Sequence, residues 1–329
     1  MYVITGGAGF IGSNIAAALE AIDADVVVAD RLGSGDVKWR NIAKRRLYDI
    51  VAPQAIIEFL TRFRGRVQGV AHMGGISTTT ETDVDFVVTS NLHLSIDLWR
   101  RCAEDRIPLV YASSAATYGD GRAGFEDRFD EPYLSRLRPM SPYAWSKHLF
   151  DRWVSRAIET GEAAPPRWAG LKFFNVYGPN EYHKGPQRSV AVQLHAQIRN
   201  LGRARLFRSE RPEYPDGGQQ RDFVWVGDCV DAVLWALRDP AAPSGLYNVG
   251  SGVARSFLDM ATILFQELGK KPDVEFVDLP DGLRDRYQYY TCAVMGKIRA
   301  AGFSEPSTSL DDGLRRYVRE FLESNDPFR

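Results

Sequence analysis

Residues 5–12 read Thr-Gly-Gly-Ala-Gly-Phe-Ile-Gly, and this stretch decides the fold of the 329-residue chain. It follows the apolar run Tyr2–Thr5 and leads into Ile11–Ile22, whose apolar residues have helical spacing, so it lies where a strand passes into a helix. Glycines there allow a tight turn and let backbone N–H groups approach a pyrophosphate. The positive end of the helix dipole adds to the attraction for phosphate. The stretch therefore predicts a dinucleotide-binding turn.

An acidic residue follows the next apolar run, Val26–Ala29. Asp30 stands about twenty residues beyond the glycines, where a carboxylate can hydrogen-bond the adenosine ribose of a dinucleotide. Asp30 alone favours NAD. Arg31 and Lys38 follow closely and could neutralise the 2′-phosphate of NADP, although both could also be solvated surface cations. We expect NADP, with NAD as the alternative.

Composition argues against several other classes of protein. Hydrophobic residues make up 44% of the chain and charged residues 25%, as in ordinary globular proteins, and the length suggests about two domains. The chain has 41 Lys+Arg against 42 Asp+Glu, which gives no bulk attraction to nucleic acid or to an anionic membrane. No uncharged apolar run approaches the ~20 residues that a membrane-spanning helix needs.

Cysteine and histidine usage points to a reducing compartment. The three cysteines are scattered without a CxxC pair, and the five histidines form no HxxxH pair, so we expect neither a disulfide framework nor a metal site. The N-terminus enters the strand-like run Tyr2–Thr5 without a basic stretch, which argues against a signal peptide. We expect a cytoplasmic protein.

The first half of the chain alternates apolar runs with amphipathic stretches, the pattern of parallel βαβ units. Hydrophobicity is continuous along the runs, which indicates a sheet covered on both faces. We therefore expect an α/β fold, a doubly wound parallel Rossmann sheet with a smaller α/β substrate domain at the C-terminal end. The expected strands are Tyr2–Thr5, Val26–Ala29, Val67–His72, Ile107–Ala112 and Arg167–Phe174, and the expected helices are Ile11–Ile22, Pro53–Arg62, Val84–Arg101 and Pro142–Thr160.

The second half is less regular. Two Pro and two Gly residues favour a loop over Arg208–Gln220. The remaining expected elements are a helix after Lys184, strands at Ala204–Phe207 and Arg221–Val224, and helices reaching Arg238 and covering Phe257–Leu268 and Leu310–Glu323.

Two further motifs place a serine, a tyrosine and a lysine near the predicted turn. Ser114 follows the expected strand Ile107–Ala112, and the carboxyl ends of strands are where ligands bind in open α/β sheets. Tyr143 and Lys147 are four residues apart, on one helix face. Oxidising an alcohol needs a base for its proton, but a free tyrosine titrates at about pH 10. Lys147 and a cationic nicotinamide would lower that pKa, while Ser114 would donate a hydrogen bond to the reacting oxygen.

These motifs resemble those of the extended short-chain dehydrogenase/reductases that act on nucleotide sugars. The resemblance runs over nearly the whole chain and includes Ser113–Gly119, Asn175–Pro179, Arg221–Val224 and Tyr247–Gly250. It implies a dinucleotide-binding domain of residues 1–174, rejoined by 221–249, and a sugar-nucleotide substrate domain of residues 175–329. Ala115 and Ala116 stand where sugar dehydratases need an Asp-Glu pair, so dehydration is disfavoured. Members with a Cys–His acid/base pair are disfavoured too, because no cysteine lies near the motifs.

One branch of this family, the ADP-glycero-manno-heptose 6-epimerases of lipopolysaccharide biosynthesis, is similar in more detail. Met73–Glu81, Glu181–Gly185 and Arg286-Tyr287-Gln288 look like that branch, and the lysine of His-Lys-Gly is its distinctive residue. The resemblance implies an isomerase that oxidises C6 to a ketone and returns hydride to either face without net consumption of cofactor. It assigns Tyr143 as the base for one epimer and Lys184 as the base for the other. Lys184 would then need a lowered pKa.

The resemblance assigns further binding roles and a homo-oligomer, with a pentamer as the family's usual form. Arg221 suits a diphosphate because its forked donors match phosphate oxygens. The implied cofactor contacts are Gly6, Gly9, Phe10, Ile11, Gly12, Asp30, Arg31, Lys38, Met73, Gly74, Gly75, Ile76, Ser77, Asn91, Lys147 and Val176. The implied nucleotide-sugar contacts are Ser77, Ser114, Asn175, Gln193, Phe207, Arg208, Ser209, Glu210, Arg221 and Tyr287.

The chain departs from the branch where substrate specificity is set. Pro186 stands where a serine follows His-Lys-Gly, Gln193 replaces a histidine, and Pro53 replaces a basic contact. A C4 epimerase of a UDP- or GDP-hexose, with Tyr143 alone as base, is therefore the alternative function. A non-catalytic dinucleotide-binding protein is a second alternative, which the intact Ser, Tyr and Lys residues oppose.

Overall fold

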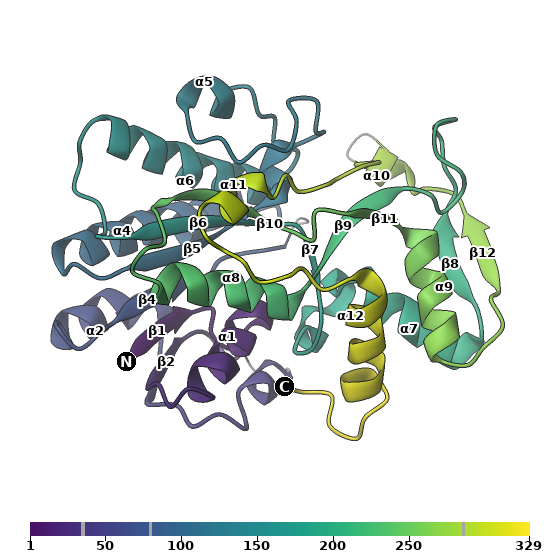
Figure 1. The fold of residues 1–329 in the computed structure, drawn as a ribbon, viewed down its shortest axis with the longest axis horizontal. Helices are drawn as coiled ribbons and strands as arrows, with labels where there is room; N and C mark the ends of the chain where they lie inside the picture. Colours follow the sequence, from purple (N-terminus) through teal and green to yellow (C-terminus); the bar gives the residue numbers. More distant parts are fainter. Residues whose placement is uncertain (34–36, 79–80, 285–286) are drawn as a thin grey trace.

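A seven-stranded sheet forms the larger part of the molecule (Figure 1). The computed structural model describes residues 1–33, 37–78, 81–284 and 287–329. The strand order is β10-β6-β5-β4-β1-β2-β3, and all neighbours are parallel. The strands are β1 (Tyr2–Thr5), β2 (Val26–Ala29), β3 (Asp49–Val51), β4 (Gly69–His72), β5 (Leu109–Ser114), β6 (Trp168–Phe173) and β10 (Gly245–Val249). The predicted doubly wound parallel sheet is confirmed.

The order of the strands reverses between β1 and β4. From β1 the chain runs outward through β2 and β3 on one side, and through β4, β5, β6 and β10 on the other. Ligands of open α/β sheets bind outside the carboxyl ends of the strands at this switch point. The fold therefore directs a ligand to the ends of β1 and β4, beside the glycine-rich turn.

Helices cover both faces of this sheet, and the predicted helices of the first half are present with changed bounds. In Figure 1, α4 (Leu94–Glu104) and α6 (Pro142–Glu159) lie above the strands, and α1 (Phe10–Glu20) and α8 (Val226–Arg238) lie below. The other α-helices are α2 (Ile56–Arg62), α3 (Val84–Val88), α5 (Glu131–Leu134), α7 (Val190–Leu201), α9 (Phe257–Glu267), α10 (Asp281–Arg284), α11 (Gly296–Ala300) and α12 (Leu310–Tyr317).

The helix expected over Val84–Arg101 is present, but it contains a π-helical turn that the sequence did not predict. α3 is followed by a π-helical turn, Thr89–His93, before α4 begins. Asn91 lies in this turn, and its side chain is bonded to the loop at Ile76. A π-turn inserts one residue into a helix, and such turns are frequent at functional sites. A second π-turn, Val318–Leu322, continues α12 and forms the last part of the helix expected over Leu310–Glu323.

The second half of the chain builds two small sheets to one side of the large one, at the right of Figure 1. β7 (Asn175–Tyr177), β9 (Gln220–Trp225) and β11 (Ala254–Ser256) form one, and β8 (Ala204–Phe207) pairs with β12 (Val274–Val277) in the other. α7, α9 and α12 pack around them over a second apolar core. The chain returns to the large sheet through α8 and β10.

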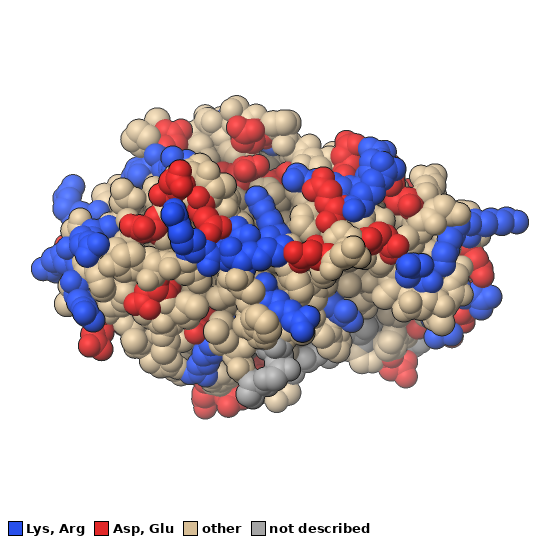
Figure 2. Space-filling model, turned by 90° about the horizontal axis from the view of Figure 1, so that it is seen from below, with Lys and Arg blue, Asp and Glu red and all other residues tan. Residues whose placement is uncertain are grey.

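Charge is mixed over the face of the molecule shown in Figure 2, where basic side chains near the centre have acidic neighbours. This distribution fits the formal net charge of −1. Within the part of the chain that the structure describes, no helix is both long enough and apolar enough to cross a membrane.

Candidate active site

A cleft of about 970 Å³ opens at the carboxyl ends of β1, β4 and β5, at the switch point of the large sheet. Most of the residues predicted for the site line it. They are Gly6, Gly9, Phe10, Ile11, Gly12, Asp30, Arg31, Lys38, Met73, Gly74, Gly75, Ile76, Ser77, Ser114, Tyr143, Lys147, Asn175, Val176 and Lys184. The fold thus brings together groups from both halves of the chain.

The glycine-rich turn is shaped so that side chains cannot enter it. Gly6 has φ +65°, and a Cβ atom there would lie 2.7 Å from the Cα atom of Gly74. A Cβ atom on Gly12 would lie 2.2 Å from the carbonyl oxygen of Gly6. The turn ends at the N-terminus of the 11-residue helix α1, which favours an anion. These residues fit the pyrophosphate of a dinucleotide.

Asp30 closes the turn from the end of β2. Its Oδ2 accepts the Ala8 N–H at 3.0 Å, and its Oδ1 accepts the Arg31 N–H at 2.7 Å. The ammonium of Lys38 also lies 2.7 Å from Oδ1. Asp30 is therefore paired with a cation, while the exposed Arg31 stands beside it at the edge of the cleft. Two cationic side chains, those of Arg31 and Lys38, thus lie beside the Asp30 carboxylate at this end of the cleft.

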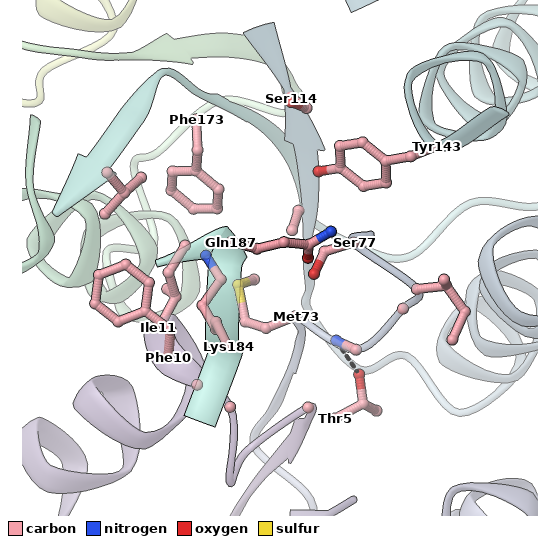
Figure 3. Close-up of a pocket in the computed structure, with 18 of the residues that line it drawn as sticks. Thr5, Phe10, Ile11, Met73, Ser77, Ser114, Tyr143, Phe173, Lys184 and Gln187 are labelled. Carbon is pink, nitrogen blue, oxygen red and sulfur yellow. Dashed lines mark hydrogen bonds between the residues drawn. The ribbon is translucent and has the colours of Figure 1, made fainter. Parts of the chain in front are cut away.

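Tyr143 faces Ser114 across a corner of the cleft (Figure 3). Ser114 ends β5, and its hydroxyl accepts the Ala116 N–H at 3.1 Å. Tyr143 is in the first turn of α6, where the side chain of Ser141 caps the helix by accepting the Ala144 N–H at 3.2 Å. Burial raises the pKa of Tyr143, and a hydrogen bond with Ser114 opposes the rise. The chain alone therefore keeps the phenol protonated.

Lys147 lies one turn further along α6. Burial lowers the pKa of Lys147 to about 8, and the negative charge of Asp151 opposes this. Asp151 is itself held in a fully buried ion pair, with its Oδ2 2.7 Å from the ammonium of Lys172. Ser113 donates a hydrogen bond to the same oxygen at 2.7 Å. Asp151 therefore fastens the end of β5 to the helix that carries Tyr143 and Lys147.

A buried histidine connects the turn to α4, and sequence reasoning missed it. The Thr5 hydroxyl lies 2.6 Å from Nδ1 of His72, and the Ser95 hydroxyl lies 2.9 Å from Nε2. Ser95 donates its hydrogen to the carbonyl oxygen of Asn91 at 2.6 Å, so it must accept from Nε2–H. Burial lowers the pKa of His72 to about 3, and Lys147 adds to the effect. The neutral ring therefore carries its proton on Nε2 and accepts from Thr5.

Asn91 extends the same chain of hydrogen bonds to α6. Its amide accepts the Ile76 N–H at 2.7 Å and donates to the Ile76 carbonyl at 3.0 Å. It also donates to the Ser146 hydroxyl at 2.9 Å, and Ser146 donates to the Tyr143 carbonyl at 2.8 Å. Asn91 itself is not among the described residues that line the cleft. It instead fastens the loop Met73–Ser77, which does line the cleft.

Lys184 approaches the cleft from the side opposite Tyr143 (Figure 3). It lies in a short 3-10 segment, Tyr182–Gln187, that bends at Gly185. Its ammonium is 5.3 Å from the ring centroid of Phe10. Burial lowers the pKa of Lys184, and Glu181 opposes the shift. Gln187, which the sequence did not single out, extends its amide between Lys184 and Tyr143.

The other residues predicted to contact the substrate are not among the described residues that line the cleft. They are Gln193, Phe207, Arg208, Ser209, Glu210, Arg221 and Tyr287. Arg221 is buried, with its guanidinium 5.5 Å from the Phe257 ring and 5.3 Å from the Tyr287 ring. Phe207 packs edge-on against Tyr287 at 6.0 Å. Phe257 itself lines the cleft, so this cluster adjoins it. Arg208, Ser209 and Glu210 follow β8 in the same region.

Gln193, on α7, turns toward the segment that carries Lys184. Its amide donates to the carbonyl oxygens of Arg188 at 2.8 Å and Pro186 at 3.4 Å. Gln193 thus supports the end of that segment. Arg286, Thr79 and Thr80 of the family motifs lie outside the described residues.

Comparison with known proteins agrees with this geometry. Residues 2–250 match the family model described as the NAD dependent epimerase/dehydratase family. The chain is 45% identical over 331 residues to an ADP-L-glycero-D-manno-heptose-6-epimerase of Nitratidesulfovibrio vulgaris (strain DP4), with 100% of both chains covered.

Solved structures are similar over nearly their whole length. The ADP-L-glycero-D-manno-heptose-6-epimerase of Helicobacter pylori matches with a TM-score of 0.79 and 25% identity, covering 97% of this chain and 95% of that one. The UDP-glucose 4-epimerase of Thermus thermophilus, solved in complex with NAD, matches with a TM-score of 0.74 and 27% identity, covering 95% of this chain and 96% of that one.

Proposed function

The chain belongs to the NAD dependent epimerase/dehydratase family, and we propose that it is an isomerase that interconverts the C6 epimers of ADP-glycero-manno-heptose. One observation carries the proposal: Tyr143 and Lys184 face the same cleft from opposite sides. A second acid/base group is useful in epimerisation through a ketone, because the sugar is deprotonated and reprotonated in two orientations. The full-length relatives that share this activity by name support the choice of sugar.

In this proposal the nicotinamide dinucleotide supplies the acceptor of the hydride and later its donor. Ser114 donates a hydrogen bond to the reacting oxygen and holds it beside the Tyr143 phenol, which exchanges its proton. Lys147, when charged, favours the phenolate because opposite charges attract. Lys184 exchanges the proton when the sugar is turned to present its other face. Its lowered pKa makes the neutral amine, the form that can accept a proton, more accessible.

We also propose the finer features of the binding sites. NADP is the proposed cofactor, with NAD as the alternative, and the positive charge of Arg31 and Lys38 beside Asp30 supports this. The buried Arg221, which adjoins the cleft through Phe257, is the proposed ligand of the sugar diphosphate. Asn175 is the proposed sugar contact, since it lines the cleft at the start of β7.

The wider setting follows from the family resemblance. We propose a homo-oligomer, with a pentamer as the expected form, and a cytoplasmic role in lipopolysaccharide biosynthesis. We also propose that residues 1–174, with 221–249, bind the dinucleotide and that residues 175–329 bind the nucleotide sugar.

A C4 epimerase of a UDP- or GDP-hexose remains the alternative. The structural similarity to the 4-epimerase from T. thermophilus favours it, at 27% identity. Tyr143 would then serve as the sole base. The position of Lys184 at the cleft favours the two-base reaction instead.

The proposal is tested by supplying purified protein with ADP-D-glycero-manno-heptose, without added cofactor, and following C6 by NMR. We expect an equilibrium mixture of both epimers. Lys184→Met should slow the conversion by about 10²–10⁴-fold, the usual contribution of a general acid/base. The matched control is Lys271→Met, because Lys271 is exposed and should leave the rate unchanged.

Other outcomes would contradict parts of the proposal. If Lys184→Met epimerises as fast as the parent in both directions, Lys184 is not the second base. If heptose is not converted while a UDP- or GDP-hexose is epimerised at C4, the alternative function holds.

A further inference from the structure

The segment Asp326–Arg329 lies against the short helical turn that carries Lys184. The Tyr182 hydroxyl donates a hydrogen bond to the Pro327 carbonyl at 2.9 Å. The rings of Tyr182 and Phe328 meet edge to face, with centroids 5.4 Å apart and planes at 89°. Tyr182 is the first residue of the Tyr182–Gln187 turn, two positions before Lys184. The last residues of the chain are therefore packed on the turn.

The same segment also contacts the start of α1. The Arg329 N–H donates to the Asn180 side chain at 2.9 Å, and its guanidinium lies 3.4 Å from Oδ1 of Asn14. Asn14 in turn donates to the carbonyl oxygens of Phe10 at 2.9 Å and Pro179 at 3.0 Å. The ring of Phe10 is the one that lies against Lys184. Asp326–Arg329 is thus joined to the turn that carries Lys184 and to α1, whose Phe10 ring lies against the Lys184 ammonium.

The turn itself is a short element with poor internal support. Hydrogen bonds of 3-10 type have less favourable geometry than those of an α-helix. Gly185, at φ +54°, breaks the helical backbone, and Pro186 follows it. Glu181 holds the two ends of the turn together, accepting from the Ser189 hydroxyl at 2.7 Å and from the Gly178 N–H at 3.3 Å. Tyr182 supplies further attachments: it packs on the smaller apolar core, and its hydroxyl and ring contact Asp326–Arg329.

A second set of contacts pins the segment to the dinucleotide side of the cleft. Lys44 forms an ion pair with Asp326 at 2.5 Å and donates to the Phe328 carbonyl at 2.5 Å. Both side chains of the ion pair are exposed, so it contributes little by itself. The ring contact and the Tyr182 hydrogen bond, which are partly buried, are the stronger candidates for holding the turn.

We propose that Asp326–Arg329 positions Lys184, with Tyr182 and Phe328 as the positioning residues. Packing of Phe328 on Tyr182 holds the turn so that the Lys184 amine faces the cleft opposite Tyr143. The inference rests on the proposed function, in which Lys184 is the second base. Tyr182 and Phe328 act through Lys184, because they lie behind the turn and outside the described lining of the cleft.

Single-turnover kinetics test this proposal, with Phe328→Ala as the main variant. Reduction of the bound cofactor is followed by absorbance after adding each C6 epimer separately. The half-reaction served by Lys184 should slow by about 10–10²-fold, since a misplacement of about 1 Å can cost 10²-fold in rate. The half-reaction served by Tyr143 should stay within about twofold of the parent. Tyr182→Phe, which removes the hydroxyl and keeps the ring, should show a smaller effect of the same selectivity.

The matched control is Phe63→Ala, because Phe63 is half-buried like Phe328 but its ring stacks on Phe59, away from the turn. This variant should leave the ratio of the two half-reactions unchanged. Equal losses in both half-reactions of Phe328→Ala, or no loss in either, would overturn the positioning role. Circular dichroism shows whether each variant folds. If Phe328→Ala does not fold, the half-reaction rates of Tyr182→Phe decide on the positioning role.

A second measurement is independent of the substrate. Titration of Lys184 by ¹⁵N NMR, assigned with Lys184→Arg, should show its pKa rising toward the ordinary lysine value in Phe328→Ala, because a displaced turn exposes the amine. In Phe63→Ala the titration should match the parent. An unchanged titration in Phe328→Ala overturns the inference. If the parent reduces its cofactor with neither epimer, the proposed function fails, and the titration still decides on the positioning role.

Discussion

Burial favours the neutral forms of the ionisable side chains Tyr143, Lys147 and Lys184 around the cleft. It raises the pKa of Tyr143 and lowers those of Lys147 and Lys184. A tyrosine that must act as a base therefore needs more positive charge beside it than Lys147 alone provides. A cationic nicotinamide ring in the cleft would supply it, because a nearby positive charge favours the phenolate. The base and the bound cofactor are thus expected to be coupled electrostatically.

The buried imidazole of His72 should make stability depend on pH. Its pKa is about 3 in the folded protein and about 6.5 in an unfolded chain. Between these values the unfolded chain binds the extra proton, so the free energy of unfolding falls as pH is lowered from about 6.5. One proton corresponds to about 1.4 kcal/mol per pH unit. We expect His72→Gln to reduce the slope by that amount, measured by urea unfolding at several pH values.

His148 and His195, whose pKa values are also lowered by burial, contribute to the slope of the parent. The slope of the free energy of unfolding against pH is therefore compared between variant and parent. It is not expected to fall to zero in His72→Gln. Leu201→Gln, at an exposed position without a titratable group, serves as the control and should keep the parent's slope. A parent-like slope in His72→Gln would show that His72 is protonated in the fold.

At the scale of elements, the site depends on short irregular segments between regular ones. The π-turn Thr89–His93 aims Asn91 at the loop beside the cleft, and the 3-10 segment Tyr182–Gln187 carries Lys184. The turn from β1 to α1 is the tightest of these junctions, because backbone atoms fill the space around its glycines. Such junctions should tolerate substitution least.

Gly12→Ala should therefore prevent tight cofactor binding. The added Cβ would meet the Gly6 carbonyl oxygen at 2.2 Å and the Gly7 Cα atom at 2.8 Å, and backbone cannot move aside as a flexible side chain can. Overpacking of this kind costs about 1–3 kcal/mol, so affinity for the dinucleotide should fall by about 5- to 150-fold. Titration of fluorescence with the cofactor measures the change.

Gly296→Ala is the matched control for this substitution. A Cβ atom at Gly296 has open space within 4 Å, and the residue starts α11, where alanine suits the helix. This variant should bind cofactor as the parent does. Tight binding by Gly12→Ala as well would mean that the turn is not the pyrophosphate site.

At the scale of the whole molecule, the cleft lies where two apolar cores meet. Phe10 belongs to the smaller core although it starts α1, and Ile11 and Val176 pack against both cores. All three residues line the cleft. A ligand bound there contacts both parts of the molecule and should stabilise them together.

Cofactor should therefore raise the melting temperature of the whole protein in one transition, and NADP should raise it more than NAD. At a free ligand concentration of 100 times the Kd, binding adds about 2.7 kcal/mol to the free energy of unfolding. Arg31→Ala should reduce the effect of NADP and leave that of NAD, whereas Arg40→Ala, at another exposed arginine, should change neither. Calorimetry of cofactor-stripped protein checks this, and stronger stabilisation by NAD would contradict the choice of NADP.

The sequence by itself determined the doubly wound sheet and a large set of the residues that line the cleft. Continuous apolar runs form buried parallel strands, and glycines mark the turn after β1. Because strand ends of a parallel sheet meet at one edge, Ser114, Tyr143 and Lys147 could be placed beside that turn from their positions along the chain. Local pattern is enough for these features, since each depends on neighbours within one element or on a general rule of α/β sheets.

Tertiary structure alone decided how the site is held. The tautomer of His72 follows from Thr5 and Ser95, which lie 67 and 23 residues away, and Tyr182 meets Pro327 across 145 residues. Asn91 was predicted to touch the cofactor, yet it lies behind the loop at Ile76. No periodicity or motif records such contacts, because they arise only when separate elements pack and leave buried polar groups that must find partners.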